Sequence, residues 1–198
     1  MDSNSGHERR GRSFWPSGPA GVIVAVVLVG VICAAVVVIA QKLHPALESP
    51  RAVETPEREA RRLFREAGRC DDPYQRIKLY TEAIHRRPDY ASAYNKRGTV
   101  YHQDLGDLDQ ALADFSKAAE LEADYAPAWY NRGLVNQDRG LYERAVADFT
   151  KAIELRSGYS KAYCMRGLAN YELRRPADAM ADYNRAIEAD PRNKVAFL

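Results

Sequence analysis

The chain has almost no excess of charge of either sign, and this excludes one large class of partner. Its 198 residues include 29 Lys and Arg against 27 Asp and Glu, which gives a formal net charge of +2. A protein that neutralises the phosphates of a nucleic acid needs a basic face well beyond this balance. The sequence therefore argues against a nucleic-acid-binding protein.

Cysteine and histidine are also sparse, and neither type clusters. The three cysteines are Cys33, Cys70 and Cys164, and no two of them have the spacing of metal ligands. The four histidines share no spacing either. The sequence also lacks a glycine-rich phosphate loop, a G-x-S-x-G elbow and an H-E-x-x-H motif. We therefore expect free thiols, no metal, no cofactor and no enzymatic activity.

One stretch has no charged residue at all. Residues 20–40 form a run of 21 residues whose only polar side chain is Cys33. As a helix this run would be roughly 31 Å long, enough to cross the ~30 Å hydrocarbon core of a bilayer. A cleaved signal peptide usually has a shorter apolar core of about 7–15 residues. We therefore favour a retained transmembrane helix over 20–40 and keep cleavage as the alternative.

The segments on either side of this run are polar. Residues 1–19 are rich in Ser, Gly and Arg and are expected to be disordered, and residues 41–56 contain three prolines and are expected to be an extended linker. Arginine and lysine are nearly balanced across the run, so the positive-inside rule decides its orientation weakly. We favour the amino terminus on the cytoplasmic side, because clustered arginines resist translocation.

The rest of the chain repeats one pattern every 34 or 35 residues. A period of this length is typical of stacked arrays, in which no single unit can bury its own apolar face. The units are 57–90, which is degenerate, and 91–125, 126–159 and 160–193. The recurring columns are Tyr94, Trp129 and Tyr163; Gly98, Gly133 and Gly167; Ala111, Ala145 and Ala179; Phe115, Phe149 and Tyr183; and Ala118, Ala152 and Ala186.

The spacing within a unit predicts two helices. In unit 126–159, Ala145, Phe149 and Ala152 have the i, i+4, i+7 spacing of an amphipathic helix. Gly133 would let a neighbouring helix approach closely, and Gly140 would end the first helix. In the last unit Arg174 stands where this turn glycine is expected.

These columns resemble the tetratricopeptide repeat family, over residues 57–193. The resemblance implies an all-α fold, a right-handed superhelical solenoid of helix-turn-helix repeats, with residues 57–198 as one domain behind the membrane helix. Residues 194–198 would begin a further helix. The residue patterns Asn-Arg-Gly and Ala-Asp-Phe in the repeats are similar to those of bacterial proteins. We therefore expect the protein to lie in the bacterial inner membrane, with the repeats on the periplasmic side.

Charged residues also recur at the period of the array. Each Asp of one column is followed three residues later by a Lys or Arg, which predicts i, i+3 surface pairs. An arginine column beside the glycines is expected to bridge to the same Asp residues, within or between units. The residues are Asp114, Asp148 and Asp182; Lys117, Lys151 and Arg185; and Arg97, Arg132 and Arg166. Carboxylates that repeat in this way do not converge on a cleft, which argues against an active site.

By the register of the family, the first helix of each unit lines a concave groove. The residues that we predict to contact a partner are Arg61, Arg65, Asn95, Lys96, Thr99, Tyr130, Asn131 and Lys161. This face is basic at its amino-terminal end and then carries amides and aromatic rings, which favours an extended, acidic protein segment. A solvated polar face without a dedicated ligand is the alternative. The carboxylate clamp of chaperone-binding members is incomplete, because Asn95, Thr99 and Met165 depart from it.

The sequence therefore predicts a membrane-anchored scaffold or adaptor that binds a protein or peptide partner in the groove. One alternative is an organelle-membrane receptor with a cytosolic repeat domain. Another is a structural component that self-associates into a homo-oligomer through an open face of the helix at 177–189.

Overall fold

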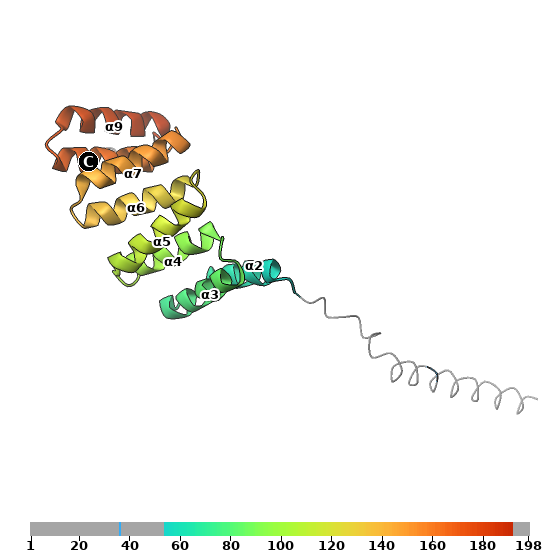
Figure 1. The fold of residues 1–198 in the computed structure, drawn as a ribbon. Helices are drawn as coiled ribbons and strands as arrows, with labels where there is room; N and C mark the ends of the chain where they lie inside the picture. Colours follow the sequence, from blue (N-terminus) through green and yellow to red (C-terminus); the bar gives the residue numbers. More distant parts are fainter. Residues whose placement is uncertain (1–35, 37–53, 192–198) are drawn as a thin grey trace, which may run out of the picture. The chain divides into compact units, whose positions relative to one another are not determined.

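The computed structural model describes Val36 and residues 54–191 of the chain. Residues 54–191 form eight α-helices and no strand. These are α2 (Pro56–Ala67), α3 (Pro73–Arg86), α4 (Ala91–Gln103), α5 (Leu108–Leu121), α6 (Ala126–Asp138), α7 (Tyr142–Leu155), α8 (Ser160–Glu172) and α9 (Pro176–Ala189). Consecutive helices pair as hairpins, and each hairpin packs against the next, so that 54–191 is one stacked array (Figure 1). The predicted all-α repeat architecture is confirmed.

The predicted membrane segment lies outside this part of the chain. Of residues 20–40 only Val36 is described, and the predicted tail 1–19 and most of the linker 41–56 are not. The helix expected to begin at 194–198 also lies outside the described residues. Within the described residues, every helix is too short or too polar to span a bilayer. The anchor therefore stays a prediction.

Side-chain caps fix where several helices begin. Thr55, Asp72 and Asp107 precede α2, α3 and α5, and each side chain accepts a hydrogen bond from the backbone N–H three residues later. These bonds satisfy amide groups that have no partner within the helix. Pro56 and Pro73 occupy the first helical positions, where the missing N–H costs nothing.

The core follows the columns of the sequence. The recurrent alanines are at most 2% exposed, and Phe115 and Phe149 have no exposed surface. The glycine column of the first helices lies against the aromatic column of the second helices of the same hairpins, so the close approach predicted at Gly133 is confirmed. The pairs in contact are Gly98 with Phe115, Gly133 with Phe149 and Gly167 with Tyr183. Each glycine thus leaves room for an aromatic ring of the facing helix.

A buried ion pair joins the two helices of each of the last three hairpins. Arg97 of α4 donates to both carboxylate oxygens of Asp114 on α5, at 2.9 and 2.7 Å. The same pair recurs in the next hairpins as Arg132 with Asp148 and as Arg166 with Asp182. The predicted bridge between these columns is confirmed, and it lies within the units.

The predicted i, i+3 pairs of Asp with Lys are wrong. The aspartates face the inside of the hairpins and are at most 5% exposed, so the arginines of the facing helix reach them. Lys117 and Lys151 stay near the surface and pair with Glu120 and Glu154, three residues further along. Burial raises the pKa of the Asp114 carboxyl, against the opposite effect of the neighbouring guanidinium.

Candidate protein-binding surface

All the residues predicted to contact a partner belong to α2, α4, α6 and α8, and we call the exposed sides of these helices the first-helix wall. α4 contacts α6, and α6 contacts α8, so three first helices lie side by side. Asn131 of α6 donates from its side-chain amide to Oδ1 of Asn95 on α4, at 2.9 Å. Nε2 of His102 lies 2.5 Å from Oδ2 of Asp138 and links the same two helices. The wall is therefore braced by side chains before any partner is bound.

Three of the predicted contact residues form hydrogen bonds within the wall. Asn95 is only 4% exposed, because α6 covers it. Thr99 donates from its hydroxyl to the backbone oxygen of Asn95, one turn earlier, at 2.9 Å. Asn95, Thr99 and Asn131 thus have a structural role in the wall, and their contact with a partner stays a prediction.

Tyr130 is packed into the array and is only partly exposed. Its ring lies 5.8 Å from the ring of Phe149 and 5.0 Å from that of Tyr159, measured between centroids. Burial raises the pKa of the Tyr130 phenol to about 12, and the neighbouring Tyr159 contributes in the same direction. A rigid, half-buried ring of this kind can present an edge to a partner at little entropic cost.

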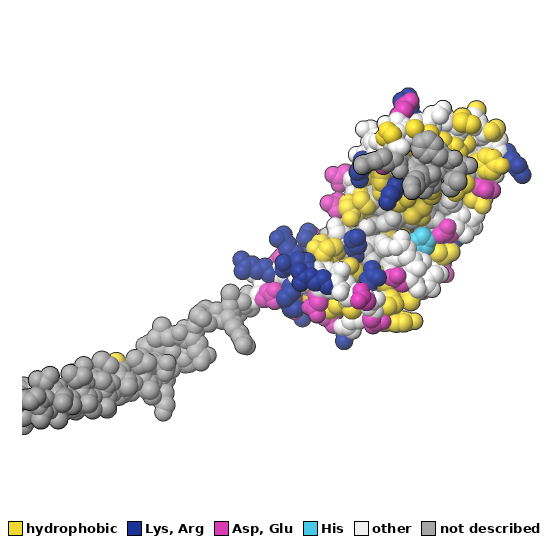
Figure 2. Space-filling view, turned by 180° about the vertical axis from the view of Figure 1, so that it is seen from behind, with side chains coloured by type: hydrophobic (Ala, Val, Ile, Leu, Met, Phe, Trp, Pro, Cys, Tyr) yellow, Lys and Arg dark blue, Asp and Glu magenta, His cyan; other side chains and the backbone are white. Residues whose placement is uncertain are grey.

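The cations of the wall are more accessible. Arg61, Arg65, Lys96 and Lys161 are all exposed, and none forms an ion pair with a described residue. Arg62, by contrast, is neutralised by Glu54, Glu59 and Glu66. Figure 2 shows that Lys and Arg side chains gather at the α2 end of the array. An acidic segment would therefore find exposed arginine side chains at this end.

The opposite end of the wall exposes two large apolar side chains in addition to Lys161. On α8, Leu168 is 36% exposed and Tyr171 is 58% exposed. Leu168 is not among the residues predicted to contact a partner, although it has the same place in its unit as Thr99, which is. The wall thus exposes more apolar surface at α8 than at α2.

The described residues offer no site for a metal. No three His, Cys, Asp or Glu side chains come together within 54–191 as ligands would. The arrangement of the wall is suited to contacts with another chain, through charge, amide groups and flat rings.

Comparisons with known proteins identify repeats in residues 103–193. The family model "Tetratricopeptide repeat" matches residues 126–159 and 160–193, and the model "TPR repeat" matches residues 103–140. No curated protein matches the sequence.

Solved structures share the fold. A crystal structure of MamA is 25% identical, covers 67% of this chain and 75% of its own, and has a TM-score of 0.60. The first repeat domain of Spaghetti (RPAP3), bound to the HSP90 peptide SRMEEVD, is 27% identical, covers 54% of this chain and 84% of its own, and scores 0.53. The repeat domain of Arabidopsis OM64 is 26% identical, covers 54% and 88%, and scores 0.52. The chain therefore contains tetratricopeptide repeats over residues 103–193, and such repeats generally mediate interactions between proteins.

Proposed function

We propose that the chain is a membrane-anchored scaffold that binds an extended segment of a partner protein along the first-helix wall. The observation that carries this proposal is the bracing of α4 and α6 by Asn95 with Asn131 and His102 with Asp138. A surface that is already ordered loses little entropy when it captures an extended segment.

The charges of the wall favour an acidic segment. Arg61 and Arg65 lie at one end, and Lys96 and Lys161 extend the positive charge along α4 and α8, all exposed and none in an ion pair with a described residue. The peptide SRMEEVD in the RPAP3 structure contains two glutamates and one aspartate. That peptide is a precedent for acidic ligands on such repeats. Because the carboxylate clamp is incomplete in this chain, we expect its partner segment to have a different sequence from that peptide.

The anchor is the second part of the proposal. Residues 20–40 would confine the wall near a bilayer and raise its effective concentration toward partners in the same membrane. We propose the bacterial inner membrane, with the repeats on the periplasmic side. A reporter enzyme active only outside the cytoplasm, fused after Leu198, should be active. A silent fusion, with a cytoplasmic reporter active at the same point, would reverse this orientation and favour a receptor with cytosolic repeats.

A charge-reversed variant tests the wall. Arg61→Glu with Lys96→Glu should abolish capture of partners in a crosslinking pull-down of the intact protein. The matched control is Lys78→Glu with Arg185→Glu, which makes the same change in net charge on the second helices α3 and α9. Partners that survive the wall variant, or that are lost equally with the control, would show that the wall is not the site.

Self-association is a second candidate, because α9 exposes apolar surface. Met180 of α9 is 61% exposed, and Tyr183 and Ile187 of the same helix are only partly buried. Contact with a second copy would cover such a face. Analytical sedimentation of residues 57–198 decides between the candidates: a strict monomer at tens of micromolar eliminates self-association.

A further inference from the structure

The arginine of each buried ion pair has one terminal nitrogen that does not face the aspartate. In two hairpins this nitrogen is satisfied by a threonine of the preceding hairpin. Nη1 of Arg97 donates to the Thr81 hydroxyl at 2.9 Å. Nη1 of Arg166 donates to the Thr150 hydroxyl at 3.0 Å. In these two hairpins the guanidinium therefore donates hydrogen bonds both to the carboxylate and to the hydroxyl.

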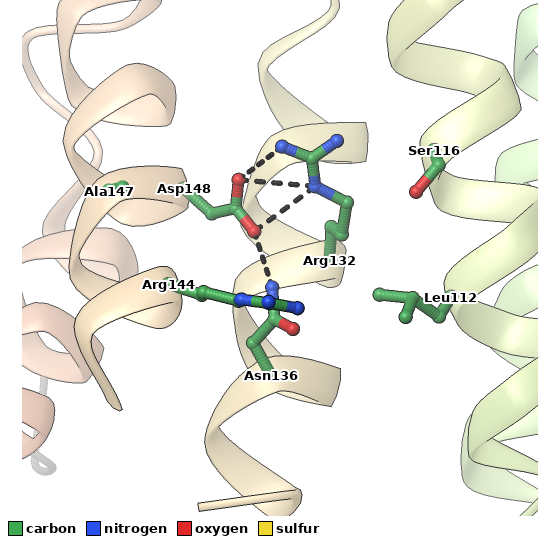
Figure 3. Close-up of a pocket in the computed structure, with 7 residues that line it drawn as sticks. All are labelled: Leu112, Ser116, Arg132, Asn136, Arg144, Ala147 and Asp148. Atoms are coloured by element: carbon green, nitrogen blue, oxygen red, sulfur yellow. Dashed lines mark hydrogen bonds and ion pairs between the residues drawn. The ribbon is translucent and has the colours of Figure 1, made fainter. Parts of the chain in front are cut away.

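The hairpin between them departs from this pattern. The position of the threonine is occupied by Ser116 of α5, and Nη1 of Arg132 has no hydrogen-bond partner among the described residues. Nε of Arg132 instead lies 3.1 Å from both oxygens of Asp148, and Nη2 donates to Oδ1 at 2.5 Å. Figure 3 shows the second terminal nitrogen of Arg132 pointing away from Asp148, toward the side of Ser116.

Arg132 lines a pocket of about 310 Å³ between α5, α6 and α7. Leu112 and Ser116 of α5, Arg132 and Asn136 of α6, and Arg144, Ala147 and Asp148 of α7 line it. Asn136 also donates to Asp148, at 2.7 Å, so the carboxylate is fully engaged within the hairpin. The pocket is built from α5, α6 and α7 and does not include the cations of the first-helix wall.

A second cation distinguishes this pocket from its neighbour. Arg144 is exposed, lines the pocket from α7 and forms no ion pair with a described residue (Figure 3). Two arginines therefore face one aspartate. The equivalent pocket of about 350 Å³ between α7, α8 and α9 is lined by two arginines and two aspartates, because Asp178 takes the place of Arg144.

We propose that the pocket lined by Ser116, Arg132 and Arg144 binds a small oxyanion, the carboxylate or phosphate group of a ligand. The Nη1 group of Arg132, the Arg144 guanidinium and the Ser116 hydroxyl supply donors of the kind that recognise such groups. Leu112 and Ala147 provide an apolar rim for the rest of the ligand. This site shares α6 with the first-helix wall, but none of its lining residues is among those predicted to contact a partner in the groove.

The test is a chemical-shift titration by NMR, with the full chain in detergent micelles. The probes are sodium phosphate and sodium acetate, with sodium chloride at matched ionic strength as the baseline. The backbone amides of Ser116, Arg132 and Arg144 should shift and saturate with at least one probe, with a Kd of about 1 mM or tighter. Saturation by phosphate alone or by acetate alone identifies the source of the oxyanion. Saturation by neither probe overturns the proposal.

Two variants separate this site from a general effect of charge. Arg144→Asp removes a hydrogen-bond donor and places a carboxylate where Asp178 stands in the neighbouring pocket. Because the new carboxylate has the same charge as the oxyanion, binding should weaken at least about 10-fold. Arg175→Asp makes the same change in the neighbouring pocket and should leave the Kd within about two-fold. Binding that survives Arg144→Asp, or that falls equally with Arg175→Asp, overturns the proposal. Circular dichroism confirms that both variants, which change exposed side chains, are folded.

Discussion

Gly133 of α6 lies directly against the ring of Phe149 on α7: a Cβ at position 133 would stand 2.7 Å from Cε1 of that ring. Carbon atoms do not tolerate so short a distance, and Phe149 has no exposed surface toward which it could move. Gly133→Ala should therefore lower the free energy of unfolding by about 1–3 kcal/mol, measured by urea denaturation followed by circular dichroism.

The matched control for this substitution is Gly158→Ala. No atom lies within 4 Å of the position that a Cβ at Gly158 would occupy, and its backbone is not in the left-handed region. Its free energy of unfolding should stay within about 0.5 kcal/mol of the parent value. An equal loss at both glycines would contradict the close helix contact.

The buried ion pairs should matter far more for stability than the surface ones. Asp182→Ala removes the acceptor of Arg166, whose side chain is 21% exposed, and leaves its charge without a partner. We expect a loss of about 3 kcal/mol in the free energy of unfolding. Glu188→Ala, which breaks an exposed pair with Arg185, should cost about 0–1 kcal/mol. Similar losses in the two variants, measured by thermal or urea unfolding, would mean that the inner pairs contribute no more than the surface ones.

The period of the sequence was enough to predict the helices and a close approach of a neighbouring helix at Gly133. That the ring of Phe149 is what lies against Gly133 came from the structure. Arg132 was also expected to reach Asp148. Such contacts follow from the pattern because each unit repeats the same solution.

Contacts between unlike positions could not be predicted in this way. Asn95 and Asn131 occupy successive, not equivalent, positions in their units, and their hydrogen bond depends on how far two first helices are offset. The aspartates were misassigned for a related reason. An i, i+3 spacing allows a surface pair with Lys117 but does not say which face of α5 is buried. Ser116 differs from Thr150 by one methyl group, and only the structure shows the different hydrogen bonding of the arginines beside them.

Alkaline pH should reveal the burial of Tyr130. Burial raises the pKa of its phenol from 10.0 to about 12. As pH rises, the phenol therefore loses its proton at a lower pH in the unfolded chain than in the folded protein. The folded state then binds more protons than the unfolded state, so this residue's contribution to stability is complete below pH 10.0 and is lost as pH approaches about 12. The difference in tyrosinate absorbance between the parent protein and Tyr130→Phe should titrate near the upper value. A midpoint at the lower value would show that the ring is open to water.

The turn between α8 and α9 contains a residue in a conformation that suits glycine better. Arg174 has φ of 61°, close to the 72° of Gly140 in the turn between α6 and α7. The backbone hydrogen bonds also correspond: the N–H of Arg174 donates to the oxygen of Tyr171 and that of Arg175 to the oxygen of Asn170, both at 2.9 Å. The left-handed conformation costs a residue with a Cβ about 1–2 kcal/mol.

Arg174→Gly should therefore stabilise the array. The relief of strain is partly offset by the greater freedom of glycine in the unfolded chain, so we expect a net gain of about 0.5–1 kcal/mol in the free energy of unfolding. Arg175→Gly is the matched control, because its φ of −111° gives glycine no advantage and leaves only the entropic loss. The two variants remove the same side chain from neighbouring positions, so urea denaturation should move their midpoints in opposite directions. If Arg174→Gly proved no more stable than Arg175→Gly, the turn would not be strained.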